Sequence, residues 1–320
     1  MESLLRAFGN LFSPAGPGAK LSILIYHRVL PEADPMLPDV VDADRFDAQM
    51  GVLSSLFNLL PLSEAVMRLK SGSLPARAAC ITFDDGYADN AEVALPILKK
   101  YGVPATFFIA TGYLNGGIMF NDKVIETVRR LSCGEHVFPE IGMRSLTGNR
   151  EKTDVVRDLL SFLKYRPLSE RQDFLDRIID SERIVLPANL MMRSDQVRLL
   201  ADSGMEIGGH TVNHPILNGL NARQAKQEIG EGRIALEEIT GQSIRLFAYP
   251  NGVPGRDYGR EHIQLLREMG FEAAVSTSRG VARRESDPFQ LPRFTPWDIP
   301  LTRFSCRLAG NLLRTRILTA

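Results

Sequence analysis

The sequence is poor in cysteine, has no net charge and contains few histidines. Its 320 residues include three Cys and five His, and Lys plus Arg equal Asp plus Glu at 38 each. Because Cys80, Cys133 and Cys306 are odd in number and widely spaced, we interpret them as thiols and expect no zinc site built from cysteine. A chain without net charge offers no electrostatic basis for binding nucleic acid or a strongly anionic substrate, so we expect no nucleic-acid partner.

Long apolar runs are also missing. No stretch approaches the apolar length of a membrane span, and residues 1–12 lack the basic region and apolar core of a secretory signal. We therefore expect a cytoplasmic protein. Hydrophobic residues make up 44% and charged residues 24% of the chain, which predicts a folded α/β protein rather than disorder.

Two adjacent carboxylates end a short apolar stretch near the first quarter of the chain. Residues 78–83 have the pattern of a buried strand, and Asp84, Asp85 and Gly86 follow directly. Half-buried neighbouring carboxylates repel each other and are unfavourable unless a cation or hydrogen-bond donors meet them. Asp-Asp-Gly is also common turn chemistry, so this stretch alone is equally compatible with a plain loop.

Two histidines follow a second short strand, expected at residues 205–209. His210 and His214 are four positions apart, but Pro215 disfavours a helical conformation at His214. The two imidazoles therefore belong to a loop, and the helical zinc-binding pattern is excluded. Two imidazoles and one carboxylate form a three-ligand set for a hydrolytic Zn²⁺, and the same set also suits Fe²⁺, Co²⁺ or Ni²⁺.

The rest of the chain alternates short apolar strands with amphipathic helices, which is typical of a parallel sheet or barrel. In a barrel, the carboxyl ends of parallel strands meet at one mouth, so the two motifs and Asn251 can converge there. Spacing alone does not distinguish a barrel from an open doubly wound sheet. The expected strands span residues 21–26, 78–83, 105–110, 205–209, 244–249, 272–276 and 291–294.

Three segments interrupt or flank this core, which we expect over residues 21–300. Residues 1–20 form an N-terminal helical segment, and about residues 113–193 form a helical insertion that either shapes a substrate cleft or only packs. Residues 301–320 form a basic amphipathic tail, predicted to be helical. Helix packing with solvated arginines accounts for its pattern, and a peripheral contact at the inner face of an anionic membrane is the alternative. Its basic residues are Arg303, Arg307, Arg314 and Arg316.

Taken together, residues 82–86 and 210–214 resemble the first two motifs of the polysaccharide deacetylases, carbohydrate esterase family four. Residues 247–252 resemble the third motif of that family. The resemblance covers roughly residues 21–112 and 195–294. It implies a distorted (β/α) barrel with fewer than eight strands, here carrying the helical insertion.

The resemblance also implies roles for individual residues. Asp85, His210 and His214 would bind a divalent metal, for which Zn²⁺ is our expectation, and Asp84 would be the general base. The backbone N–H of Asn251 would stabilise the oxyanion, because this residue aligns with the Tyr that donates it in the family.

The chain departs from the family pattern at two places. Ala248 replaces the Arg of the third motif, so Arg245 or Arg293 would have to contact the base, and Arg293 resembles an Arg seen late in this subgroup. The late His that usually acts as general acid has no counterpart, since His262 lies in a predicted helix that we expect to be exposed. His27, after the first strand, either lines the site as a proton donor or is a loop residue bonded to backbone.

We therefore predict a metal-dependent hydrolase that removes N-acetyl groups from an amino-sugar-containing polysaccharide or its precursor, as in exopolysaccharide biosynthesis. Two alternatives stay open. The first is a sugar O-acetyl esterase or a hydrolase of another non-peptide C–N bond, for which a missing general acid matters less. The second is a non-catalytic glycan-binding protein built on a degenerate site.

Overall fold

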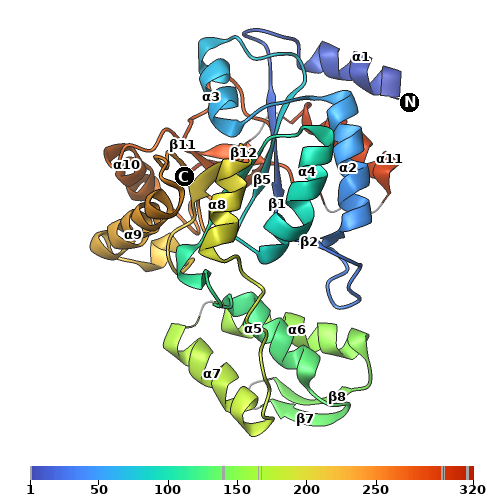
Figure 1. Ribbon diagram of the computed structural model, residues 1–320, viewed down its shortest axis with the longest axis vertical. Coiled ribbons are helices and arrows are strands. Elements are labelled where there is room, and N and C mark those ends of the chain that lie inside the picture. Colours follow the sequence, from blue (N-terminus) through green and yellow to red (C-terminus); the bar gives the residue numbers. More distant parts are fainter. Residues whose placement is uncertain are drawn as a thin grey trace.

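The computed structural model describes residues 2–138, 141–164, 166, 168–296, 298, 300–314 and 317–320 (Figure 1). Within these residues, seven parallel strands form a nearly closed barrel in the order β1-β5-β6-β9-β10-β11-β12. This confirms the predicted barrel with fewer than eight strands. The strands are β1 (Leu21–Tyr26), β5 (Ala78–Phe83), β6 (Ala105–Ile109), β9 (Glu206–Gly209), β10 (Leu246–Ala248), β11 (Ala273–Arg279) and β12 (Leu291–Arg293).

The ring is closed by Phe294, directly after β12. Its amide N lies 2.7 Å from the carbonyl O of Ile23, and its own carbonyl accepts from the amide of Ile25 at 3.0 Å. These bonds join β12 to β1 in parallel.

The strands are mostly buried because both of their faces are covered. β1 and β5 are buried at all six positions. Alternate residues point into the barrel, where Ile23 and Cys80 meet Leu62 of α3 (Leu62–Ser71) in one apolar cluster. The other residues, such as Leu24 and Phe83, pack outward against helices.

Helices surround the barrel, and three very short strands lie beside it. The helices around it are α1 (Glu2–Phe12), α2 (Ala43–Leu56), α4 (Leu95–Tyr101), α8 (Ser194–Asp202), α9 (Ala222–Thr240), α10 (Arg260–Glu268) and α11 (Leu301–Asn311). The short strands are β2 (Val29–Leu30), β3 (Val41–Asp42) and β4 (Asn58–Leu59). None of the described helices is long and apolar enough to cross a membrane.

The segment of residues 120–181, between β6 and β9, forms a lobe on the side of the barrel opposite α1 and α3 (Figure 1). It contains α5 (Phe120–Arg130), α6 (Asn149–Leu163) and α7 (Leu168–Ser181), near the three expected helical patterns. It also contains an antiparallel hairpin of β7 (Gly134–Phe138) and β8 (Gly142–Leu146). Each strand of this hairpin buries only its last residue, Phe138 or Leu146, so the sequence carries little strand signal.

The tail differs from its prediction. Its helix, α11, ends at Asn311, so the expected helix over the whole tail is too long. Phe304 and Leu308 are fully buried, and Arg303 and Arg307 pair with the buried Asp298. The apolar face is thus covered by the protein itself, which agrees with the packing interpretation. Arg316 lies outside the described residues.

Candidate metal centre and catalytic pocket

The three residues expected to bind a metal meet at the carboxyl ends of β5 and β9. One ligand atom from each of Asp85, His210 and His214 lies within 4.8 Å of the others. Asp85 Oδ1 is 3.3 Å from His210 Nε2 and 3.5 Å from His214 Nε2. The side chains come from loops 125 positions apart, and they converge because both loops leave the same mouth of the barrel.

Both imidazoles turn Nε2 toward Asp85. His210 Nδ1 lies 2.7 Å from the carbonyl O of Ala248, which can only accept, so Nδ1 carries a proton and Nε2 is the atom that a cation would bind. Burial acts to lower the pKa of His210, but its hydrogen bond with Asp85 and the charges of Asp84 and Asp85 raise it. Burial lowers the pKa of His214 to about 4, so this ring is neutral at neutral pH.

Asp85 supplies the clearest sign that the set fits a metal. Its Oδ1 is buried and has no hydrogen-bond partner among the described residues. A buried carboxylate oxygen without a donor is costly, and a divalent cation between it and the two Nε2 atoms would remove that cost. The chemistry of the set and the orphaned oxygen therefore both fit a bound divalent metal.

The loops at this site are conformationally strained. Four of the seven described non-glycine residues with positive φ lie here: Asp85, Thr211, His214 and Asn251, at 79°, 66°, 52° and 57°. Such conformations cost of order 1–3 kcal/mol each and are typical of functional sites. The fold holds these residues in place against that cost.

Asp84, the expected base, is bound by Arg293. Its two oxygens lie 2.7 Å from Arg293 Nη1 and Nη2, and Arg293 Nε donates to the carbonyl of Ser276 at 2.9 Å. Burial acts to raise the pKa of Asp84, but the Arg293 charge outweighs it and lowers the pKa. Asp84 therefore stays ionised and can accept a proton. Arg245 instead pairs with Glu272 on the exposed surface, so Arg293 is the arginine that contacts the base.

The remaining predicted residues, His27 and Asn251, line the same pocket of about 400 Å³ as Asp84, Asp85 and the two histidines. The Asn251 carbonyl accepts from Thr277 Oγ1 at 2.8 Å, which fixes the loop. His27 is exposed, and its carbonyl accepts from the side chain of Asn90 at 2.8 Å. The structure thus brings all seven predicted residues to one place, and their individual roles stay predictions.

The expectation for His262 is wrong in one respect. It lies in α10 as predicted, but it is only 4% exposed. Its Nδ1 accepts from the backbone N of Gly259 at 3.0 Å, so it caps the start of the helix and faces inward.

Sequence reasoning missed Glu228, which holds the histidine loop. This residue of α9 accepts hydrogen bonds from the backbone N of Val212 at 3.0 Å and of Asn213 at 2.8 Å, and from the Asn213 side chain at 2.8 Å. In the sequence it is one of several charged residues on a helix, and nothing distinguishes it from them.

The insertion also contributes to the pocket. Asn121, Asp122 and Ile125 of α5 form part of its lining. The insertion therefore shapes the cleft, which was one of the two alternatives that the sequence left open.

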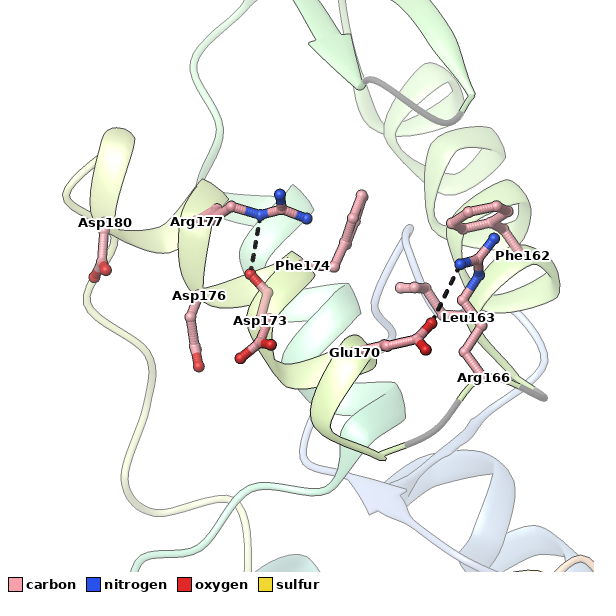
Figure 2. Close-up of a pocket in the computed structure, with 9 residues that line it drawn as sticks. All are labelled: Phe162, Leu163, Arg166, Glu170, Asp173, Phe174, Asp176, Arg177 and Asp180. Carbon is pink, nitrogen blue, oxygen red and sulfur yellow. Dashed lines mark hydrogen bonds and ion pairs between the residues drawn. The ribbon is translucent and has the colours of Figure 1, made fainter.

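A second pocket of about 580 Å³ lies inside the insertion, between the end of α6 and α7 (Figure 2). Figure 2 shows two of its charged side chains engaged with near neighbours, since Arg166 pairs with Glu170 and Arg177 Nε donates to the carbonyl of Asp173. No predicted catalytic or metal residue lines it. We therefore place the reaction at the barrel mouth.

An ionised aspartate beside an Asp/His/His set, at the mouth of a β/α barrel, is typical of metal-dependent hydrolases. The family model named polysaccharide deacetylase matches residues 71–274, and the chain belongs to this family. The family predicted from the motifs, and the deacetylase class of enzyme with it, are confirmed.

Individual relatives agree with this assignment. A Bacillus subtilis (strain 168) protein assigned by its name to the polysaccharide deacetylases is 24% identical over 277 residues, 86% of this chain and 71% of that protein. Poly-β-1,6-N-acetyl-D-glucosamine N-deacetylases of Staphylococcus aureus are 26% identical in strain MRSA252 and 41% in strain N315, over 181 residues in each case. That match covers 52% of this chain and spans 60% of the staphylococcal proteins.

Solved structures share the fold. IcaB from Ammonifex degensii superimposes with a TM-score of 0.59 at 19% identity, covering 94% of this chain and 99% of that one. The Streptococcus pyogenes deacetylase PplD, in complex with acetate, gives a TM-score of 0.58 at 21% identity, covering 87% and 92%.

Proposed function

We propose that this protein hydrolyses N-acetyl groups on a polymer of N-acetylglucosamine, with Zn²⁺ bound by Asp85, His210 and His214. The observation that carries the proposal is the pairing of an ionised Asp84 with the neighbouring Asp/His/His set in one pocket. The N-deacetylases of Staphylococcus aureus support the substrate class, because their name gives an N-acetylglucosamine polymer. Exopolysaccharide biosynthesis and a cytoplasmic location are parts of the same proposal.

The predicted site residues have separate chemical roles in this reaction. A bound divalent metal would supply Lewis-acid polarisation and a more acidic water. Asp84, kept ionised by Arg293, accepts the proton of the attacking water. The backbone N–H of Asn251 donates to the oxygen that becomes negative when the carbonyl is attacked. His210, oriented by the Ala248 carbonyl, keeps its Nε2 available as a ligand.

Metal content and acetate release, measured together, test the proposal. We expect purified protein to contain close to one zinc per chain and to release acetate from N-acetylglucosamine oligomers. Asp85→Ala should lose both properties, because it removes the carboxylate shared by the two histidines. A wild-type protein that purifies without metal and gains no activity with added Zn²⁺ would contradict the proposal.

A second candidate is the hydrolysis of sugar O-acetyl esters. The missing late histidine favours it, since an alkoxide leaves more readily than an amide nitrogen and depends less on a proton donor. Parallel assays on N-acetyl and O-acetyl sugars decide between the two reactions. A protein that binds zinc but cleaves only the O-acetyl esters would be a sugar O-acetyl esterase.

A further inference from the structure

Amide hydrolysis needs a proton donor, and among the predicted residues only His27 was a candidate. The nitrogen leaves poorly as an anion, so a proton must reach it while the C–N bond breaks. His262, the last histidine of the chain, is 4% exposed and caps α10, so it does not face the pocket. The two metal-set histidines are already turned toward Asp85.

One acidic side chain of the pocket takes no part in the proposed metal set or in the Asp84–Arg293 pair and is deeply buried. Asp122 of α5 is 4% exposed and lines the pocket together with Asp84 and Asp85. Its Oδ2 accepts a hydrogen bond from Tyr87 Oη at 2.8 Å. When Asp122 is protonated, Tyr87 thus leaves Oδ1 as the oxygen that carries the proton.

The nearest cation, Arg28, pairs with Asp122 but lies closer to another carboxylate. Arg28 lies over the Tyr87 ring, with 4.8 Å between its guanidinium carbon and the ring centroid. Its Nε binds Asp89 Oδ2 at 2.8 Å, whereas its Nη1 is 3.8 Å from Asp122 Oδ1, beyond hydrogen-bond distance. Arg28 therefore interacts more strongly with Asp89 than with Asp122.

These surroundings affect the proton affinity of Asp122. Burial raises its pKa to about 6, and Asp85 and Glu126 act in the same direction, while Arg28 and the Tyr87 hydrogen bond oppose the shift. Asp84 shows the opposite behaviour, because Arg293 lowers its pKa. Two carboxyl groups whose environments separate their pKa values in this way are typical of an acid and base pair.

We propose that Asp122 is the general acid of this enzyme and donates its proton to the leaving nitrogen, an assignment that rests on the N-deacetylation proposed above. The hydroxyl of water bonds to the carbonyl carbon while the other proton passes to Asp84. The C–N bond breaks with its electron pair on nitrogen, which takes the proton of Asp122. One amide and one water give one amine and one acetic acid, and exchange with solvent returns both aspartates to their starting states.

Asp122→Asn tests the assignment in the full-length protein with two substrates. On N-acetylglucosamine oligomers we expect kcat to fall by about 10²–10⁴-fold with little change in KM. On 4-nitrophenyl acetate, whose leaving group needs no proton, we expect activity within about threefold of the wild type. Zinc content and Tm, measured on the same sample, show that the site and the fold are intact.

Tyr87→Phe and His27→Gln are the comparison variants. Loss of the Tyr87 hydrogen bond raises the pKa of Asp122, so the alkaline limb of kcat against pH should move to higher pH. His27→Gln should show no loss that is selective for the amide substrate, because the proton comes from Asp122. Should Asp122→Asn not fold, the shift in Tyr87→Phe tests the assignment by itself.

The assignment would be overturned by a rise in KM alone in Asp122→Asn, by equal losses on both substrates, or by an amide-selective loss in His27→Gln instead. Zinc-loaded wild type without acetate release would remove the proposed function together with this assignment. If wild type and Asp122→Asn released acetate from the oligomers equally well, the proposed function would stand and only the role of Asp122 would be refuted.

Discussion

Asp84 and Asp85 are adjacent in the chain, yet their carboxylates face different partners. Asp84 is bonded at both oxygens by Arg293, whereas Asp85 presents a bare, buried oxygen to two imidazoles. The positive φ of Asp85, 79°, turns the second carboxylate away from the direction of the first. Two identical side chains can therefore serve as a base and as a metal ligand.

The first prediction concerns Arg293, which is 1% exposed. Its removal leaves the Asp84 charge buried and unpaired, a change that costs about 3–5 kcal/mol. We expect Arg293→Ala to lower the free energy of unfolding by about that amount, measured by urea denaturation, and to abolish acetate release.

Arg245→Ala is the matched control, because the Arg245–Glu272 pair has side chains that are 60% and 50% exposed. Exposed pairs contribute about 0–1 kcal/mol, so this variant should keep both stability and activity. Equal unfolding free energies for the two variants would refute the structural importance of the Asp84–Arg293 pair.

At the scale of elements, α9 positions the histidine loop although none of its residues was expected in the site. Glu228 receives three hydrogen bonds from the loop, and Gly232 lets the helix approach it closely. A Cβ added at Gly232 would lie 2.9 Å from the backbone C and O of Thr211, closer than real contacts allow.

The second prediction compares two glycines of this helix. Gly232→Ala forces α9 away from the loop, and we expect a loss of about 1–3 kcal/mol together with weaker zinc binding. Gly230→Ala meets only the end of the Met269 side chain at 3.4 Å, so we expect it to stabilise the helix by about 0.5–1 kcal/mol. Thermal unfolding and zinc titration of both variants check this. Equal zinc affinities would show that α9 does not position the histidine loop.

At the scale of the whole molecule, the C-terminal segment completes the barrel. Phe294 joins β12 to β1, and the ring of Phe304 packs against it with centroids 6.5 Å apart. Arg307 Nη2 donates to the carbonyl of Thr295 at 2.6 Å. The helix thus covers the seam of the barrel.

The third prediction follows from this position. Phe304→Ala should cost about 3–5 kcal/mol, because it empties a fully buried site beside the closing strand. Leu313→Ala is the control, since Leu313 is 50% exposed and should change stability by less than about 0.5 kcal/mol. A tail that instead served as a membrane anchor would give an unchanged Tm for Phe304→Ala and reduced binding to anionic vesicles.

The sequence by itself determined the strand pattern, the two motifs and the residues that end their strands. These features are local: apolar runs of strand length, Asp-Asp-Gly after one of them, and His210 and His214 after another. Since parallel strands share one mouth, local patterns also sufficed to predict that the motifs meet.

Only the tertiary structure decided which distant side chains complete the site. Arg293 pairs with Asp84 although the two residues are 209 positions apart. From the sequence, Arg293 was only one of two candidate partners for Asp84. Glu228 and Asp122 gave no signal, because a charged residue on a helix has the same pattern whether it faces solvent or a pocket. Their burial and partners arise from packing between segments far apart in sequence, which neither periodicity nor spacing encodes.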